Sequence, residues 1–314
     1  MKSFFKPKSV IRACLDFAFR RVDFVWLLMS NSELLRIKNK QKTPYKKKRL
    51  QAVNIKYYKR PNDRLGLKEM NMKKKAIVVG ATSGIGLEVA RLLASGGYEV
   101  GIAGRREERL RDIMRETEGI VAYRRIDVRS AEAPQQLLDM IRELGGIDLY
   151  FHSSGIGWQN GSLEADKEIA TVETNGVGFT RMVTAAYNWF ADSGKAGRIA
   201  CITSIAGTKG LGAAPAYSAT KRFQTHYLEC LSQQARMRQL PVRITDIRPG
   251  FVATDLIAGS NFPLQLSADS VAADILKAVE KGREVVTIDW RYRLLVAFWR
   301  LLPRSLWVRL RFVK

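Results

Sequence analysis

The sequence predicts an α/β protein in which a doubly wound sheet of seven parallel strands is flanked by helices. From Lys75 onward, short apolar runs alternate with stretches whose apolar residues recur at helical intervals. The first apolar run enters a glycine-rich turn that leads directly into a helical stretch. Repeated strand–helix units favour parallel strands with helices on both faces of the sheet. A chain of 314 residues is long enough for one such domain of roughly 240 residues plus appendages.

We expect three parts: a basic extension over residues 1–71, a domain over 72–288 and a basic aromatic tail over 289–314. The extension has little sustained periodicity, which predicts a disordered or loosely helical segment. Its longest apolar patch, residues 24–29, is too short to span a bilayer. A second interpretation is that this extension is translated leader sequence, because Met72 followed by three lysines and an apolar run resembles a natural start.

The formal net charge of +23 is concentrated at the two ends of the chain. Residues 1–71 hold 19 Lys and Arg against 5 Asp and Glu, a net of +14. The remainder lacks an aromatic–basic RNA motif or a DNA-reading helix, so we expect no nucleic-acid partner. The three cysteines are scattered without metal-ligand spacing, and only two histidines occur. We therefore expect no disulfide framework, no metal and a cytoplasmic location.

The first predicted strand, residues 76–79, ends in the turn Gly80-Ala-Thr-Ser-Gly84-Ile-Gly86, and residues 87–94 are helical. Glycines let the backbone approach a pyrophosphate closely, while a helix N-terminus supplies amide donors. The strand before the turn and the helix after it strengthen this interpretation. The predicted phosphate cradle consists of Gly80, Thr82, Ser83, Gly84, Ile85 and Gly86.

The second predicted strand, residues 98–103, ends at Gly104-Arg105-Arg106. An NAD-binding unit usually has an acidic residue here to accept from the ribose hydroxyls. Arginine instead favours the 2′-phosphate of NADP, so we expect NADP at Arg105, with NAD as the alternative. We interpret Arg106 as the start of the solvated helix over residues 107–118.

The remaining units continue the strand–helix alternation. A third strand precedes Asp127 and Val128, and a fourth precedes His152-Ser-Ser-Gly155, at the strand ends where open α/β sheets bind ligands. We interpret His152 as a packed strand-end residue. The predicted ranges are strands over 121–126, 147–151, 200–203, 242–247 and 284–288, and a helix over 131–144.

The helical run from Ala216 to Arg238 places Tyr217 and Lys221 four residues apart on one face. A phenol ordinarily titrates at about 10, and a nearby positive charge lowers that value toward neutrality. We therefore expect Lys221 to tune Tyr217 for proton transfer. Ser204, at the end of an apolar run, is positioned to hold the same substrate oxygen. Asn175 lowers helix propensity inside a predicted helix, which indicates a specific polar task.

In this order and spacing, the motifs of residues 72 to about 288 resemble the short-chain dehydrogenase/reductase family, in its single-domain Rossmann form. The resemblance implies a catalytic tetrad of Asn175, Ser204, Tyr217 and Lys221. It implies a cofactor site that includes the glycine turn, Arg105, Asp127, Val128, Gly155, Tyr217, Lys221, Pro249, Gly250, Val252 and Thr254. Two departures, Val79 for threonine and His152-Ser-Ser-Gly155 for Asn-Asn-Ala-Gly, concern local bracing and leave the chemistry in place.

The resemblance implies hydride transfer between a nicotinamide and a carbonyl or secondary alcohol. Tyr217 would protonate the oxygen, Ser204 would steady it, Lys221 would hold the nicotinamide ribose, and Asn175 would anchor a water that reloads the proton. We also expect a homo-oligomer, a dimer or tetramer. The alternatives are a catalytically inactive NADP-binding scaffold and a membrane-surface interaction protein.

Two apolar segments bear on substrate and partners. Residues 251–267 contain Leu256, Ile257, Phe262, Leu264 and Leu266, which predicts a flap over a hydrophobic, lipid- or steroid-like substrate; the flap packing on the sheet or a subunit is the alternative. Residues 290–314 hold seven Lys and Arg and no acid, interleaved with aromatic residues. This pattern predicts two short helices, broken near Pro303, lying peripherally on the inner face of an anionic membrane. Packing of their apolar face on the enzyme or a subunit is the equally weighted alternative.

Overall fold

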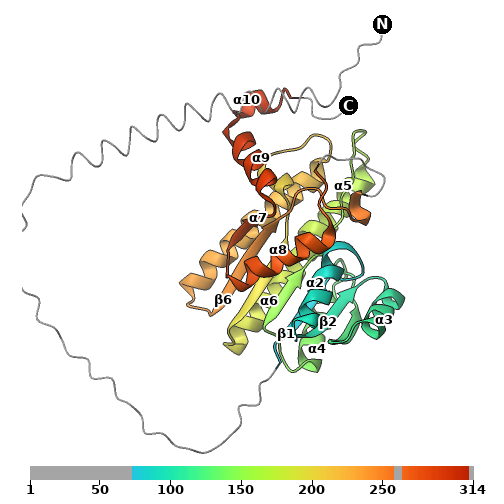
Figure 1. The fold of residues 1–314 in the computed structure, drawn as a ribbon. Coiled ribbons are helices and arrows are strands. Elements are labelled where there is room, and N and C mark those ends of the chain that lie inside the picture. The colour runs from blue at the N-terminus through green and yellow to red at the C-terminus, as the bar shows by residue number, and fades with distance from the viewer. Residues whose placement is uncertain (1–72, 258–263, 311–314) are drawn as a thin grey trace, which may run out of the picture. The chain divides into compact units, whose positions relative to one another are not determined.

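The computed structural model describes residues 73–257 and 264–310 (Figure 1). The sheet within these residues contains seven parallel strands in the order β3-β2-β1-β4-β5-β6-β7. The strands are β1 (Lys75–Val79), β2 (Glu99–Gly104), β3 (Ile120–Arg125), β4 (Leu149–His152), β5 (Gly197–Ile202), β6 (Val242–Arg248) and β7 (Val285–Thr287). The strand order reverses between β1 and β4, which opens a crevice at their carboxyl ends. The predicted doubly wound Rossmann sheet is confirmed.

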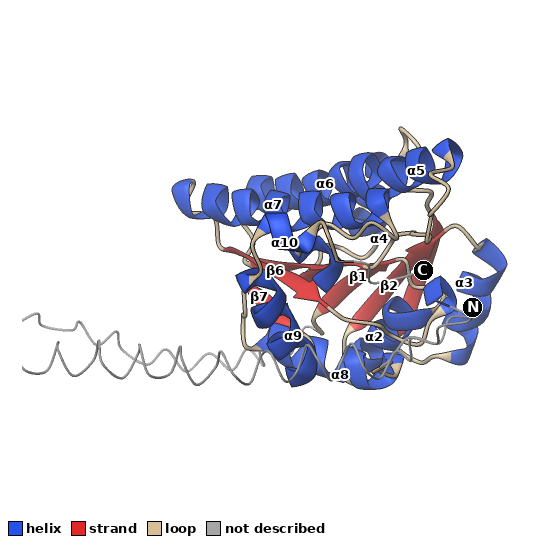
Figure 2. Ribbon diagram, turned by 90° about the horizontal axis from the view of Figure 1, so that it is seen from above, coloured by secondary structure: helices blue, strands red, loops and turns tan. Residues whose placement is uncertain are grey.

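Helices cover both faces of this sheet (Figure 2). One layer contains α4 (Ala133–Glu143), α6 (Phe179–Ser193) and α7 (Pro215–Met237), and the other contains α2 (Gly84–Ser95), α3 (Glu107–Glu116) and α8 (Ala268–Glu280). Alternate residues of β1 separate the two cores, since Ile77 packs with α4 and α6 while Val78 packs with α2 and α8. Each layer therefore buries one face of the sheet, as alternating strand–helix units predict.

The segment around Asn175 departs from a regular helix. The α-helix α5 (Ala165–Val172) continues into the π-helical turn η1 (Glu173–Gly178), which joins α6. Such turns are rare and often lie at functional sites. The predicted helix is therefore present, but a wider turn interrupts it where Asn175 is buried.

Two short helices, α9 (Trp290–Leu301) and α10 (Arg304–Trp307), follow β7 and form what we call the C-terminal arm. Asp289 caps α9 by accepting from the backbone N–H of Arg291 at 2.8 Å. Pro303 separates the two helices, as predicted. No helix within the described residues has the length and apolarity that a bilayer crossing requires. The predictions for residues 1–71, for Phe262 and for residues 311–314 lie outside the described residues.

Candidate active site

The glycine turn after β1 lies between two other loops at the carboxyl end of the sheet. Gly80 has a φ of +87°, and a Cβ there would lie 2.6 Å from the backbone nitrogen of Ser154, after β4. Gly84 has a φ of +56°, and its Cβ would lie 2.9 Å from Cγ2 of Thr254, after β6. Both positions favour glycine on conformation and space. The predicted cradle and the predicted nicotinamide-side loop are therefore neighbours.

The start of α2 has the properties of a phosphate site. Ser83 is the N-cap residue, and its side chain makes no capping hydrogen bond to the helix. The first amides of α2 are thus available to an anion, and the helix dipole adds a partial positive charge. A Cβ at Gly86 would lie 2.2 Å from the carbonyl oxygen of Gly80, so the turn closes tightly only with glycine. These residues fit the diphosphate of a nicotinamide dinucleotide.

Arg106 contacts this turn directly. Its guanidinium donates to Oγ1 of Thr82 and to Oγ of Ser83, each at 2.8 Å, and lies 3.8 Å from a carboxylate oxygen of Asp255. The sequence interpretation placed Arg106 at the exposed start of α3 and missed this contact. Arg105 is exposed beside it, and its charge helps to lower the pKa of Asp127.

Asp127 and Val128 follow β3, where the resemblance placed the adenine side. Burial alone would raise the pKa of Asp127, but hydrogen bonds from the side chain and backbone of Arg129 outweigh it and lower the pKa. Val128 is buried against Gly178 of η1. The structure places both residues at the carboxyl edge of the sheet, and their contact with adenine stays a prediction.

Ser204 and Tyr217 come together from different elements. Ser204 ends the extended segment after β5, and its Oγ accepts from the backbone N–H of Ala206 at 3.1 Å. Burial raises the pKa of Tyr217, and a side-chain hydrogen bond with Ser204 acts in the opposite direction. Gly157 lies against the tyrosine ring, since a Cβ there would be 2.3 Å from Cδ2. The serine and tyrosine hydroxyls thus adjoin one another, and their common contact with a substrate oxygen stays a prediction.

Lys221 is buried behind Tyr217, with its Nζ 5.7 Å from the centre of the tyrosine ring. The ammonium donates to the carbonyl oxygen of Ile202 and to Oε1 of Gln224, both at 3.0 Å. Desolvation lowers the pKa of Lys221 to about 8, with Asp246 acting in the opposite direction. The structure corrects one expectation here: the pKa of Tyr217 lies above its ordinary value, because burial outweighs the hydrogen bond that lowers it.

Asn175 is fully buried in η1 and links the loop after β4 to the catalytic helix. Its Oδ1 accepts from the backbone N–H of Ile156 at 2.9 Å, and its Nδ2 donates to the Ile156 carbonyl oxygen at 2.6 Å and to Oγ1 of Thr220 at 3.3 Å. Gly155 lies between these groups, since its Cβ would be 3.2 Å from Oδ1 of Asn175 and 3.6 Å from Nζ of Lys221. The four tetrad residues are therefore brought together, and their roles stay predictions.

His152 is a packed residue at the end of β4. It is fully buried, its Nδ1 lies 2.8 Å from the hydroxyl of Tyr150, and burial lowers its pKa to about 3. The ring is therefore neutral at physiological pH, as expected for a structural histidine. Within the described residues, no group of three His, Cys, Asp or Glu side chains has the geometry of a metal site.

The loop after β6 completes the site and meets the C-terminal arm. The carbonyl oxygen of Pro249 accepts from the backbone N–H of Ile205 at 3.1 Å, which ties this loop to the Ser204 segment. Gly250 lies against the ring of Tyr292, since a Cβ there would be 2.2 Å from Cζ. Val252 is buried and forms an isolated β-bridge with Leu266.

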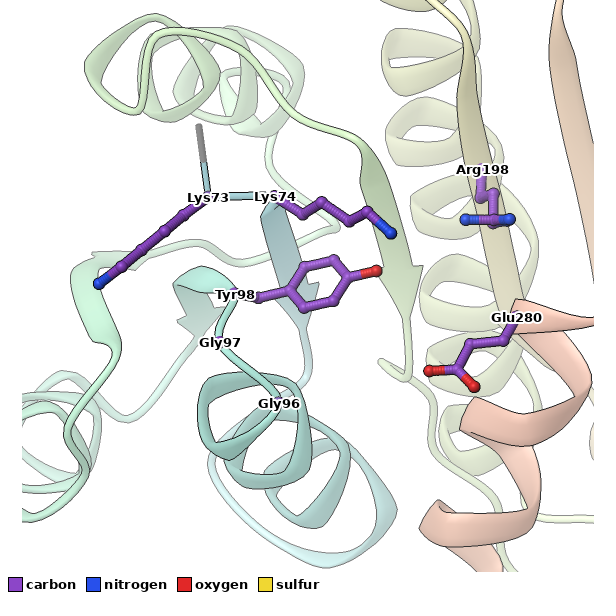
Figure 3. A pocket seen from close by; sticks show the side chains of 7 residues that line it. All are labelled: Lys73, Lys74, Gly96, Gly97, Tyr98, Arg198 and Glu280. Atoms are coloured by element: carbon purple, nitrogen blue, oxygen red, sulfur yellow. The ribbon is translucent and has the colours of Figure 1, made fainter. Parts of the chain in front are cut away.

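The hollow drawn in Figure 3 lies at the opposite end of the sheet, where β1, β2 and β5 begin. It has a volume of about 470 Å³ and is lined by Lys73, Lys74, Gly96, Gly97, Tyr98, Arg198 and Glu280. A second hollow, of about 520 Å³, borders the loop after Ser204 and is lined by residues including Gly207, Ser218 and Arg222. Of these two hollows, only the second lies beside the predicted catalytic residues.

The model of the short chain dehydrogenase family matches residues 74–262, and the chain belongs to this family of oxidoreductases. An uncharacterized oxidoreductase of Myxococcus xanthus is 30% identical over 241 residues, which cover 74% of this chain and 94% of that protein. One of Mycobacterium tuberculosis is 31% identical over 249 residues, with coverages of 75% and 94%. Family membership supports an enzyme that acts on CH–OH or C=O groups with a nicotinamide cofactor.

Solved structures show the same fold. A short-chain dehydrogenase/reductase of Burkholderia phymatum in complex with NAD has a TM-score of 0.65 and 20% identity, covering 77% of this chain and 97% of its own. Actinorhodin polyketide ketoreductase with NADPH has a TM-score of 0.61 and 24% identity, with coverages of 69% and 95%. At these identities the likeness establishes the architecture alone.

Proposed function

We propose that this chain is an NADP-dependent reductase that transfers a hydride between the nicotinamide and a hydrophobic ketone or secondary alcohol. The observation that carries the proposal is the junction of Ser204, Tyr217 and Lys221 beside a glycine turn that fits a dinucleotide. The catalytically inactive scaffold is less well supported, because each tetrad side chain lies at the carboxyl edge of the sheet beside the others.

The bound nicotinamide would supply or accept the hydride. In the reducing direction, Tyr217 donates its phenolic proton to the substrate oxygen, and Ser204 donates a hydrogen bond to the same atom. Lys221 keeps a positive charge behind the phenol and holds the nicotinamide ribose through a remaining N–H. Asn175 holds the loop after β4 in place and anchors a water that reloads the proton. General acid catalysis of this kind is worth about 10²- to 10⁴-fold.

The preference for NADP rests on the end of β2. Arg105 is exposed there, and Arg106 contacts the glycine turn. Arg105 takes the position after the second strand where an NAD-binding unit usually has an acidic residue. An acid would repel a 2′-phosphate, whereas a guanidinium pairs with it through charge-assisted hydrogen bonds. Among the similar folds, one was solved with NADPH and another with NAD, so the fold accommodates either dinucleotide.

A hydrophobic substrate is supported by the side chains around the site. Leu256 and Leu264, on either side of residues 258–263, are exposed at 45% and 47%. Phe251 and Leu266 pack on the apolar cluster formed by Ile205, Tyr292 and Val296. A long-chain or steroid-like ketone would cover such side chains and remove their apolar surface from water.

We also propose membrane contact through residues 290–310, which is compatible with packing of the arm's buried side chains on the enzyme. The buried side chains Tyr292, Val296 and Trp307 face the enzyme. The outer side presents Trp290, Leu294, Leu295, Leu301, Leu306, Val308 and Leu310, together with Arg293, Arg300, Arg304 and Arg309, all exposed. Exposed leucines and arginines on the same short arm suit the headgroup region of an anionic membrane.

A homo-oligomer is supported by apolar side chains on α5, η1 and α7. Ile169, Val172, Val177 and Phe223 are all exposed in the single chain. A second copy covering these helices would bury that apolar surface. Sedimentation of the full chain would distinguish the dimer or tetramer that we expect from a monomer.

The direct test of the proposed activity is a screen for NADPH oxidation with the purified full chain. The substrates are long-chain 3-keto lipids, ketosteroids and small aldehydes, each measured at matched concentrations. We expect kcat/KM to be highest for a lipid-like or steroid ketone. Turnover confined to small polar aldehydes would contradict the substrate class, and binding of NADPH without any turnover would favour the inactive scaffold.

A further inference from the structure

One buried side chain beside Lys221 has no part in the chemistry described above. Gln224 lies one helical turn after Lys221 on α7 and is fully buried. Its Oε1 accepts from Nζ of Lys221 at 3.0 Å, and its Nε2 donates to the main-chain carbonyl oxygen of Asn175 at 2.9 Å. A single amide thus bridges two members of the tetrad.

The orientation of this amide is determined by its partners. An ammonium has only donors, and a main-chain carbonyl oxygen only accepts. The reversed amide would face a donor with a donor and an acceptor with an acceptor, leaving both partners unpaired in a buried place. The bridge therefore fixes which atom of Gln224 faces Lys221.

We propose that Gln224 is a positioning residue that keeps the Lys221 ammonium charged and aimed at the cofactor ribose. The proposal rests on the proposed function, in which Lys221 holds that ribose. Two of the three ammonium donors are directed to Ile202 and Gln224, so the third has one remaining direction. Since Gln224 is itself tied to Asn175, the lysine cannot turn without breaking the bridge.

The titratable groups near Lys221 are paired or neutral, so uncharged acceptors solvate its ammonium. The titratable groups that face it are Tyr217 on its own helix, His152 on β4, Cys201 on β5 and Asp246 on β6. The carboxylate of Asp246 is already paired with Arg248 at 2.7 Å and accepts from Thr203 at 2.5 Å. His152 is neutral, and burial raises the pKa of the Cys201 thiol. The amide and the Ile202 carbonyl are thus the atoms that directly solvate the ammonium.

The direction in which the pKa of Lys221 shifts depends on which protonation state of the lysine each substitution of Gln224 favours. Methionine at position 224 removes an acceptor from the ammonium, so the pKa of Lys221 should fall. Glutamate places a negative charge there, so that pKa should rise. A side chain that only filled space would not produce shifts of opposite sign.

The test uses the full chain with Gln224→Met, Gln224→Glu and a control, Gln233→Met, at an exposed position of the same helix. ¹⁵N-lysine NMR, assigned with Lys221→Met, gives the pKa of Lys221, and NADPH fluorescence gives the affinity for NADPH across the same pH range. We expect the pKa to fall by about one pH unit with methionine and to rise by a similar amount with glutamate. The pH above which NADPH affinity declines should move the same way, with the control unchanged.

Equal Lys221 titration in wild type and both variants, or shifts of the same sign, would overturn the proposal. If Gln224→Met does not fold, Gln224→Glu decides, because an unchanged or lowered pKa of Lys221 in that variant would overturn the proposal. The NMR titration needs neither cofactor nor substrate. Failure of the reductase assay would therefore leave this result intact, and the two failures are distinguishable.

Discussion

At the residue scale, the site depends on a few polar contacts made across long sequence separations. The pairing of Tyr217 with Lys221 could be predicted from their spacing on one helix, whereas the resemblance to a known family placed Ser204 and Asn175 in the same tetrad. The contacts of Arg106 and Gln224 could not be predicted, since their partners Thr82 and Asn175 lie 24 and 49 residues away. Likewise, the raised pKa of Tyr217 depends on burial, which residue spacing does not measure.

The two arginines after β2 give a prediction about cofactor choice. Arg105→Asp should lower kcat/KM for NADPH relative to NADH by roughly 10- to 100-fold, because a charged hydrogen bond of about 1.5–3 kcal/mol is replaced by repulsion. Arg106→Asp should act in the same direction and also disturb the turn at Thr82 and Ser83. Arg115→Asp, at an exposed position of α3, is the matched charge control. A wild type that already prefers NADH would refute this explanation.

At the scale of elements, the C-terminal arm packs on the two loops that frame the site (Figure 1). The indole of Trp299 donates to Oγ1 of Thr208 at 2.8 Å, and that of Trp307 donates to the carbonyl oxygen of Gly210 at 2.6 Å. Sequence periodicity predicted the two helices and the break at Pro303, but not which face is buried. Which face is buried depends on the loop after Ser204, and the sequence of the arm alone does not determine the shape of that loop.

Tyr292 of the arm contacts the chain on both sides of residues 258–263, within the segment predicted to form a flap. Its hydroxyl accepts from the backbone N–H of Phe251 at 3.1 Å and donates to the carbonyl oxygen of Leu264 at 2.9 Å. Tyr292→Phe keeps the ring against Gly250 and removes both hydrogen bonds, each worth about 0.5–1.5 kcal/mol. We expect a roughly 5- to 10-fold rise in KM for the ketone and faster proteolysis within residues 251–267. Tyr123→Phe on β3 is the control, and an unchanged KM and cleavage rate would show that the hydroxyl does not hold the flap.

At the scale of the whole molecule, the glycine turn, the four tetrad residues and the C-terminal arm meet at the carboxyl edge of the sheet. The parallel sheet, the helices on both of its faces and the strand ends that carry the site could all be predicted, because parallel strands separated by helices admit few topologies. For the arm, the sequence predicted two alternatives, contact with a membrane and packing on the enzyme or a subunit, without a choice between them. The structure shows an inner face on the enzyme and leaves an outer apolar and basic face exposed.

The outer face gives a prediction about membranes. Leu294→Glu with Leu301→Glu changes two side chains exposed at 61% and 66%, without touching Tyr292, Trp299 or Trp307. The full chain should sediment with anionic vesicles at low salt, and this variant should lose at least about tenfold in affinity through added charge repulsion and lost apolar contact. Met237→Glu, at the end of α7, is the control. Failure of the wild type to bind these vesicles would discard membrane contact.

The central claim, that Tyr217 is the proton donor of a reductase, is tested most directly by Tyr217→Phe. With the best ketone from the NADPH screen, this variant should lose about 10²- to 10⁴-fold in kcat while its Kd for NADPH stays within a few-fold of wild type. The control is Tyr227→Phe, ten residues further along α7, whose hydroxyl contacts Thr184 at 2.7 Å. Turnover of Tyr217→Phe within tenfold of wild type would contradict the account.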